Sequence, residues 1–104
     1  MKLAYSPWGK VQTKEPIIPN KMFQVHTARH GGIKLDRELN KLVPACMRSK
    51  GGWYEEDCEW SIAFECVKHW ITASDCDWAK QTIASGAHTE TLKRWYPEHH
   101  ALLY

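Results

Sequence analysis

The spacing of apolar and polar positions divides the chain into two parts. Residues 10–15 and 22–27 mix β-branched and aromatic residues with polar neighbours, and a segment with two prolines and an asparagine lies between them. This pattern is typical of two strands joined by a turn. Residues 33–35 follow a glycine pair and add a third short strand. The first part of the chain therefore predicts a small antiparallel meander.

The second part has mainly helical spacing. Asp36 is placed to cap a short helix that reaches Leu42. Apolar positions then recur every three or four residues from Glu55 to about Ile71, which predicts a central helix. Residues 60–66 also alternate between apolar and polar positions, so a strand is the alternative interpretation of that segment.

Further helices are expected towards the end of the sequence. Ser74 and Asp77 resemble a capping box, which predicts a helix that ends at Gly86. Residues 89–96 fit another helix, and the tail after Pro97 fits a last turn that docks through its leucines. The sum is an α+β fold, in which a small N-terminal antiparallel β-meander is followed by three to four helices packed on one face.

Length and hydropathy limit the class of protein. The 104 residues, 43% of them hydrophobic and six of them tryptophan, suit one domain over residues 1–104. No long uncharged apolar stretch is present, and the first residues lack the apolar core of a signal peptide. We therefore expect a cytoplasmic protein that has no membrane partner.

The cysteines are best interpreted as reduced, partly buried thiols. Cys46, Cys58, Cys66 and Cys76 contain no C-x-x-C pair. A site that combines them with histidines is a weaker alternative, because the close paired spacing of structural zinc sites is missing. The acidic run at residues 55–59 also lacks the alternating ligands of a calcium loop. We therefore assign no metal and no cofactor.

Charge is distributed unevenly along the chain. Residues 1–50 contain ten Lys/Arg and three Asp/Glu (+7), whereas residues 51–104 contain four and nine (−5). One interpretation is that the two halves fold together and neutralise each other, with the acids pairing with Arg29, Lys34 or Arg37. The other is that an exposed charged face attracts a charged partner.

Residues 51–60 are the most informative segment, because four carboxylates lie between aromatic residues directly after a glycine pair. The pattern predicts a loop that leads into a helix capped by the acids. A second glycine-bounded turn carries His30. If the two loops meet, a carboxylate could orient the imidazole for acid–base chemistry, or His30 only holds its loop together. A nucleophilic Cys58 is disfavoured, because the neighbouring acids repel a thiolate. The candidate binding residues are His30, Trp53, Tyr54, Glu55, Glu56 and Asp57.

Four ordered motifs carry a resemblance that spans nearly the whole chain. They are Ser6-Pro7-Trp8-Gly9, His30-Gly31-Gly32 with Leu35, the run from Gly52 to Trp60, and Arg94-Trp95-Tyr96-Pro97. Together they resemble an uncharacterised domain family found in phage and plasmid proteins. The resemblance implies residence on a mobile genetic element, and it carries no activity, substrate or catalytic residue with it.

These observations favour a protein that acts by stoichiometric binding to a host protein complex. Host-defence inhibitors, including anti-CRISPR proteins, are molecules of this kind. An enzyme or enzyme accessory module that uses His30 with Glu56 or Asp57 is the first alternative. Nucleic-acid binding through the basic N-terminal half is the second alternative, although no recognised nucleic-acid motif accompanies the basic residues. We assign no catalytic residue.

Overall fold

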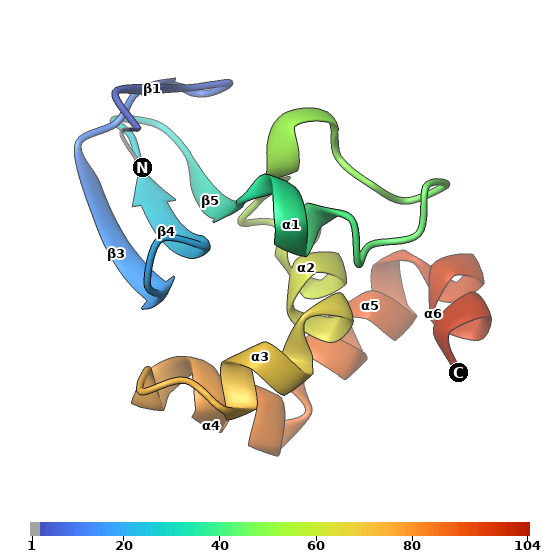
Figure 1. Ribbon diagram of the computed structural model, residues 1–104. Coiled ribbons are helices and arrows are strands. Elements are labelled where there is room, and N and C mark those ends of the chain that lie inside the picture. Colours follow the sequence, from blue (N-terminus) through green and yellow to red (C-terminus); the bar gives the residue numbers. More distant parts are fainter. Residues whose placement is uncertain (1–2) are drawn as a thin grey trace.

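A four-stranded antiparallel sheet and a two-stranded hairpin form the β part of the protein (Figure 1). The computed structural model describes residues 3–104. Its strands are β1 (Tyr5–Ser6), β2 (Gly9–Lys10), β3 (Thr13–Ile18), β4 (Met22–His26), β5 (Gly31–Leu35) and β6 (Trp53–Glu55). Its helices are α1 (Arg37–Asn40), α2 (Trp60–Cys66), α3 (Lys68–Thr72), α4 (Asp77–Ser85), α5 (Ala87–Trp95) and α6 (Pro97–Leu103), and a 3-10 turn spans Lys50–Gly52.

The sheet has the strand order β3-β4-β5-β6, with every neighbouring pair antiparallel. Strand β6 pairs with β5 in the register Gly32↔Glu55, Ile33↔Tyr54 and Lys34↔Trp53. Because opposite residues in a ladder share a face, Ile33 and Tyr54 point together to one side. These two side chains are 3% and 1% exposed, so this side is the inner, core-forming face of the sheet.

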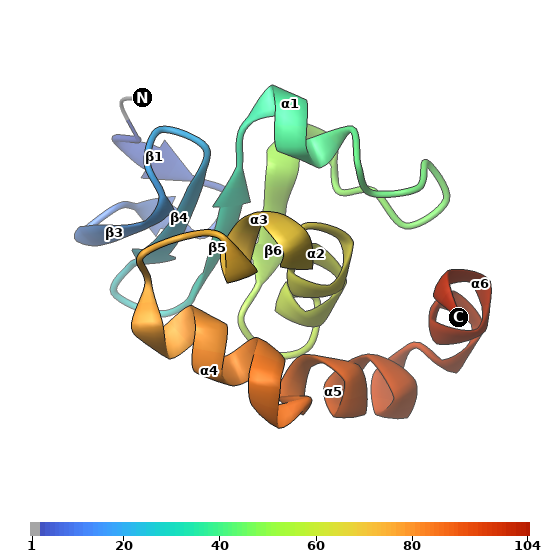
Figure 2. The same cartoon turned by 60° about the horizontal axis from the view of Figure 1, so that its bottom comes forward.

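Helices cover the inner face of the sheet (Figure 2). Helix α2 lies against β5 and β6, α3 lies against β3, and α5 packs on α2 with α6 beyond it. Phe64, Ile71 and Leu92 bring α2, α3 and α5 into one buried cluster with the inner residues of the sheet. None of the helices in residues 3–104 is long and apolar enough to cross a membrane.

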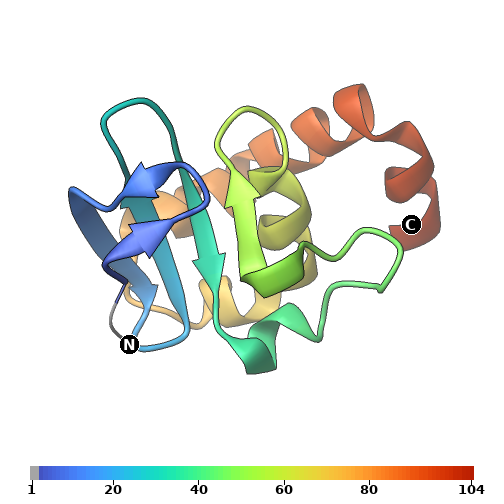
Figure 3. The same ribbon diagram turned by 90° about the horizontal axis from the view of Figure 1, so that it is seen from above.

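The hairpin of β1 and β2 lies over the opposite, outer face of the sheet (Figure 3). Trp8, between these two strands, contacts the sheet at Gly32. Gly32 has no side chain there, and the Trp8 ring occupies the space where its Cβ would lie. The Trp8 and Trp53 rings meet edge to face, with their centroids 5.6 Å apart. Phe23 and Val25 are also buried on this face, at 6% and 0% exposure. The sheet therefore has an apolar layer on each side.

The expected α+β class and the N-terminal meander are confirmed, and the strand boundaries differ in part. Strand β4 lies at the expected place, and β5 includes Gly31 and Gly32 in addition to residues 33–35. Strand β3 starts at Thr13 and continues through Pro16, which we expected in the turn. An edge strand tolerates proline, because its outward N–H has no partner in the sheet. The register of β3 shifts directly after Pro16.

The continuous central helix expected from Glu55 to Ile71 is wrong. Residues 53–55 form strand β6, and α2 begins only at Trp60. A break at Val67, with φ −115° and ψ 18°, then separates α2 from α3. The strand alternative for residues 60–66 is also wrong, since α2 spans them. A three-residue strand is too short to show a period, so only its pairing with β5 reveals it.

Most other helix expectations are confirmed, but the described residues form six α-helices, more than the three to four expected. The carboxylate of Asp36 caps α1 by accepting a hydrogen bond from Leu39 N–H at 2.8 Å. Helix α4 ends at Gly86, whose φ of 78° suits glycine. The capping box is wrong, because the Ser74 hydroxyl donates to the Ile71 carbonyl at 2.6 Å and closes α3. The tail forms α6, where Leu103 packs on the core but Leu102 is 69% exposed.

The close approach at Gly32 gives a direct test of the packing. An alanine Cβ would collide with the Tyr54 carbonyl oxygen and would lie 2.5 Å from Cη2 of Trp8. We expect Gly32→Ala to lower the free energy of unfolding by about 3 kcal/mol, since overpacking against backbone cannot relax easily. Gly86→Ala is the control, because it meets open space and carries only the strain of φ 78°, about 1–2 kcal/mol. Urea denaturation measures the free energy of unfolding of both variants. Equal decreases in the two variants would contradict the close packing at Gly32.

Candidate functional site

The two glycine-bounded loops meet at one end of the β5–β6 pair. Glu56 N–H donates to the Gly31 carbonyl at 3.0 Å, directly beyond the last ladder pair, Gly32↔Glu55. The Gly31 backbone also packs closely on this segment, because a Cβ there would lie 3.1 Å from Oε2 of Glu56. The expectation that the loops come together is therefore confirmed. We call the place where they meet, residues 30–32 and 55–57, the loop junction.

His30 lies beside Glu55 at the loop junction. Its Nδ1 is 3.7 Å from Oε1 of Glu55, and the two side chains are 50% and 34% exposed. Glu56 and Asp57, the partners that the enzyme alternative needs, form no ion pair with His30 in the described part of the chain. The His30 loop is held mainly by Thr27, whose hydroxyl donates to the His30 carbonyl at 2.7 Å. The pair is thus an open surface contact.

Tyr54 is a correction to the expected surface. Its side chain is 1% exposed, because it points to the inner face of β6. The hydroxyl donates to Oδ1 of Asn40 at 2.6 Å and accepts a hydrogen bond from Ser49 N–H at 3.2 Å. Burial raises the pKa of Tyr54 to about 12. Tyr54 therefore ties the loop after α1 to the core and has no place in a binding surface.

Trp53 is half-buried on the outer face, where it packs against Trp8. The carboxylates of Glu56 and Asp57 are exposed. Neither makes an ion pair with another residue among those that the structure describes. Glu59 instead accepts a hydrogen bond from Glu55 N–H at 3.0 Å. The acids therefore do not cap α2, whose first residue has no side-chain cap.

The expected neutralisation of the two halves by ion pairs is also not seen. Arg29, Lys34 and Arg37 form no ion pair with the acidic run within residues 3–104. The acidic loop junction lies at the Gly31 end of β5, whereas Lys34 lies towards the other end of that strand. The charge asymmetry of the sequence therefore persists in the folded molecule.

A groove of about 230 Å³ opens beside the loop junction on the inner side of the sheet. Its walls come from β4, β5, α2 and α4, and its lining residues are Gln24, His26, Gly32, Ile33, Glu56, Trp60, Phe64, Trp78 and Thr82. Trp60 and Phe64 meet edge to face at 5.1 Å, and the Phe64 and Trp78 rings are 6.2 Å apart. The Trp78 side chain is 38% exposed. The groove thus combines an aromatic wall with the exposed carboxylate of Glu56.

Of these lining residues, only Glu56 is among the candidate binding residues predicted from the sequence. Trp60 and Phe64 lie within the segment of the expected central helix, and Trp78 lies within the helix expected to end at Gly86. His26 stands at the end of the strand expected at residues 22–27. In the register of the sheet it lies opposite Gly31, which is how it reaches the groove. Only the position of α4 over the sheet brings Trp78 to the same place, and no local signal in the sequence encodes that position.

The cysteines play no part in the groove. All four are free, and Cys46 is exposed, which corrects the expectation that each is partly buried. The Sγ of Cys58 lies 3.1 Å from the Tyr96 hydroxyl, a contact that joins the turn before α2 to the end of α5. Burial raises the pKa of the Cys66 thiol to about 11, so that thiol stays protonated at neutral pH. In residues 3–104, no three His, Cys, Asp or Glu side chains gather as a metal centre requires.

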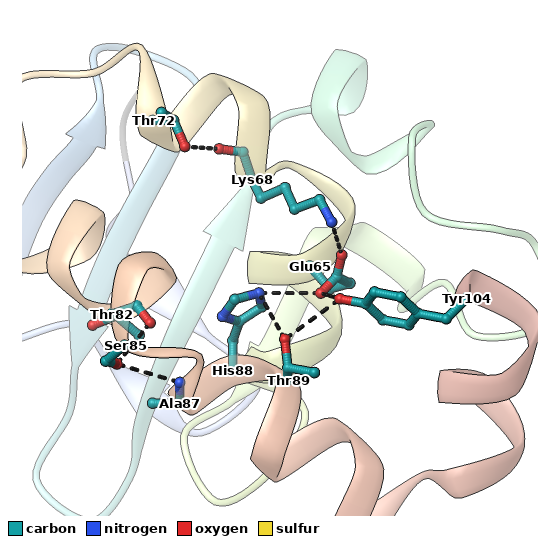
Figure 4. A network of polar contacts seen from close by, with 9 residues as sticks. All are labelled: Glu65, Lys68, Thr72, Thr82, Ser85, Ala87, His88, Thr89 and Tyr104. Carbon is teal, nitrogen blue, oxygen red and sulfur yellow. Dashed lines mark hydrogen bonds and ion pairs between the residues drawn. The ribbon is translucent and has the colours of Figure 1, made fainter.

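A buried polar cluster joins α2, α5 and the C-terminal residue (Figure 4). Glu65 lies at its centre and is only 6% exposed. Its Oε1 is 3.1 Å from Nε2 of His88 and also accepts the Tyr104 hydroxyl, while Oε2 is 2.6 Å from Nζ of Lys68. Thr89 adds a hydroxyl 3.2 Å from Nε2 of His88. No motif in the sequence indicates this cluster, because Glu65 lies inside an apolar stripe.

The cluster fixes charge in the core. Burial alone would raise the pKa of Glu65, but the contacts with Lys68, Tyr104 and His88 outweigh it and lower the pKa. Burial lowers the pKa of His88 more than the carboxylate of Glu65 raises it. Glu65 is therefore charged and His88 neutral at pH 7. None of these residues lines the groove, so we interpret the cluster as a structural tie between helices.

Loss of the Glu65 charge should destabilise the protein in a pH-dependent way. We expect Glu65→Gln to lower the free energy of unfolding at pH 7 by about 2 kcal/mol, because it removes charged hydrogen bonds. The folded protein holds the pKa of Glu65 below its ordinary value of 4.5. The stabilisation is therefore complete above that pH and disappears as the pH falls through the lower, folded pKa.

Urea denaturation between pH 7 and pH 3 measures this difference. Glu98→Gln is the control, because Glu98 is exposed on α6 and makes no ion pair in the described chain. The wild-type protein and Glu65→Gln should converge in acid, while Glu98→Gln follows the wild type throughout. The difference in free energy of unfolding between wild type and Glu65→Gln should shrink in acid. If this difference stays constant down to pH 3, the carboxylate charge does not stabilise the fold.

Among known proteins, the chain matches a family model but no individual curated protein or solved structure. No curated protein and no solved structure gives a significant match to the chain. A family model described as "Domain of unknown function (DUF7007)" matches residues 1–104. This agrees with the resemblance to an uncharacterised domain family, and it adds no ligand, partner or reaction. Since the match covers the whole sequence, the chain belongs to the family of this domain of unknown function.

Proposed function

We propose that the protein acts by stoichiometric binding to a host macromolecular complex, through the loop junction and the adjoining aromatic groove. The observation that carries the proposal is the pair of exposed carboxylates, Glu56 and Asp57, which have no ion-pair partner in the described chain. Glu56 lines the groove, and Asp57 follows it in the same loop. Free charge beside a half-exposed aromatic ring is typical of interface hot spots with a polar surround.

The partner surface should be basic and should offer an apolar side chain or stem to the groove. Glu56 contributes negative charge, while Trp60 and Trp78 offer ring faces and edges. Lys and Arg side chains match both features, because they combine an apolar stem with a cation that aromatic rings attract. Complementary charge of this kind fixes orientation and raises the association rate.

The resemblance to phage and plasmid proteins makes a host complex in the cytoplasm the expected setting, as for host-defence inhibitors. The enzyme alternative has less support. His30 lies on the open surface beside Glu55, and it does not line the groove where a substrate would be enclosed. Catalysis by an imidazole and a carboxylate needs both groups within reach of one bound substrate.

Charge reversal at the loop junction tests the proposal. The tagged protein is used to capture partners from a lysate of the cells that carry it, with nucleic acid digested in a parallel sample. We expect Glu56→Lys with Asp57→Lys to abolish capture, because like charges then face the basic partner. Glu90→Lys with Glu98→Lys is the matched control, since both acids are exposed on α5 and α6 and the change in charge is the same. Capture by both double variants alike would refute the proposed surface.

The aromatic wall is tested separately with the captured partner. Trp78→Ala should weaken binding about thirtyfold, which corresponds to the loss of about 2 kcal/mol that is typical of a hot-spot tryptophan. Trp95→Ala removes a ring that is 59% exposed on α5, outside the groove, and should bind as the wild type does. Surface plasmon resonance with immobilised partner gives both affinities. Undiminished binding by Trp78→Ala would restrict the interface to the carboxylates and would exclude the groove.

A further inference from the structure

A second hollow lies at the opposite end of the β5–β6 pair from the loop junction. It has a volume of about 350 Å³ and is bordered by the end of β5, helix α1 and the loop that leads to Gly51. Its lining includes four cationic side chains, Lys34, Arg37, Lys41 and Arg48, and no carboxylate. We call it the basic hollow. Such a concentration of one sign of charge in a concave site attracts counter-ions.

The cations of the basic hollow are not neutralised by carboxylates of residues 3–104. None of the four forms an ion pair within the part of the chain that the structure describes. The nearby acids Asp36 and Glu38 both pair with Lys21, at 3.6 and 3.0 Å. Asp36 also caps α1 through Leu39 N–H. The carboxylates of this region are therefore occupied away from the hollow.

Two of the four cations are held in place before any ligand arrives. Arg48 donates from Nε to the Val43 carbonyl at 2.8 Å and from Nη2 to the Lys41 carbonyl at 3.3 Å. Lys34 donates to the Gly51 carbonyl, and its Nζ lies 5.2 Å from the centre of the Trp53 ring. Burial lowers the pKa of Lys34 more than Asp36 raises it, so its charge is already partly desolvated. Preformed donors of this kind lose little entropy when they bind a ligand.

We propose that the basic hollow binds a phosphate group. A phosphate carries several acceptor oxygens, which matches donors that converge from α1, β5 and the following loop. The guanidinium group of Arg37 offers a planar fork that suits phosphate oxygens. Arg48 already donates from Nε and Nη2 to backbone carbonyls, so it contributes its positive charge and its remaining N–H donors. The phosphate belongs either to a nucleic-acid strand or to a small phosphorylated compound. Both sources present the same group to the same four cations.

Direct binding measurements distinguish the two sources. Calorimetry measures the affinity for inorganic pyrophosphate, which represents a small phosphorylated compound. Fluorescence anisotropy measures the affinity for a labelled single-stranded oligonucleotide, which represents a nucleic-acid strand. We expect Arg37→Glu with Lys41→Glu to weaken binding of whichever probe the wild type binds by at least tenfold. For a strand, the logarithm of the affinity should fall linearly with the logarithm of the salt concentration, with a slope of about −0.7 for each phosphate that the cations neutralise.

The matched control is Lys93→Glu with Arg94→Glu, which makes the same change in charge on exposed residues of α5. It should leave binding within twofold of the wild type. Circular dichroism checks that both double variants fold. If Arg37→Glu with Lys41→Glu does not fold, Arg37→Gln with Lys41→Gln takes its place. Binding of pyrophosphate alone assigns a small phosphorylated ligand, and binding of the oligonucleotide assigns a strand. The proposal is overturned if neither probe binds or if both double variants weaken binding equally.

Discussion

The pairing of β6 with β5 is the constraint on which the rest of the structure depends. Only three residue pairs form this ladder, from Gly32↔Glu55 to Lys34↔Trp53. It puts Tyr54 into the core and delivers Glu56 to the Gly31 carbonyl. Glycine at position 32 is required, because the Trp8 ring and the Tyr54 carbonyl occupy the place of a side chain. Close backbone packing thus joins two segments that are more than twenty residues apart.

The same pairing separates the charges of the molecule. The acidic loop junction lies at one end of β5, and the basic hollow lies at the other, so a strand of five residues divides two opposite electrostatic regions. Neither region is neutralised by ion pairs across the sheet within residues 3–104. Between them the inner face is closed by α2 and α3, whose buried residues form the core. This separation of an acidic and a basic surface agrees with the proposal that the protein acts by stoichiometric binding.

The sequence predicted the features that depend on local chemistry. The meander, the Asp36 cap and the end of α4 at Gly86 each follow from residues close to one another in the chain. The sequence did not predict β6, because three residues show no period and are defined only by their partner strand. It also placed Tyr54 on the surface, since the side of the sheet to which a residue points depends on register. The groove and the basic hollow likewise combine residues from several elements, which no local motif specifies.

The β5–β6 ladder can be observed directly in solution by nuclear magnetic resonance. Ile33 lies opposite Tyr54 in the ladder, and directly beyond its last pair the Glu56 amide donates a hydrogen bond to the Gly31 carbonyl. The account predicts that the Glu56 amide exchanges slowly with deuterium, and that cross-strand nuclear Overhauser effects connect the backbones of Ile33 and Tyr54. Exchange of the Glu56 amide at the rate of an unstructured peptide, without cross-strand effects, would contradict it.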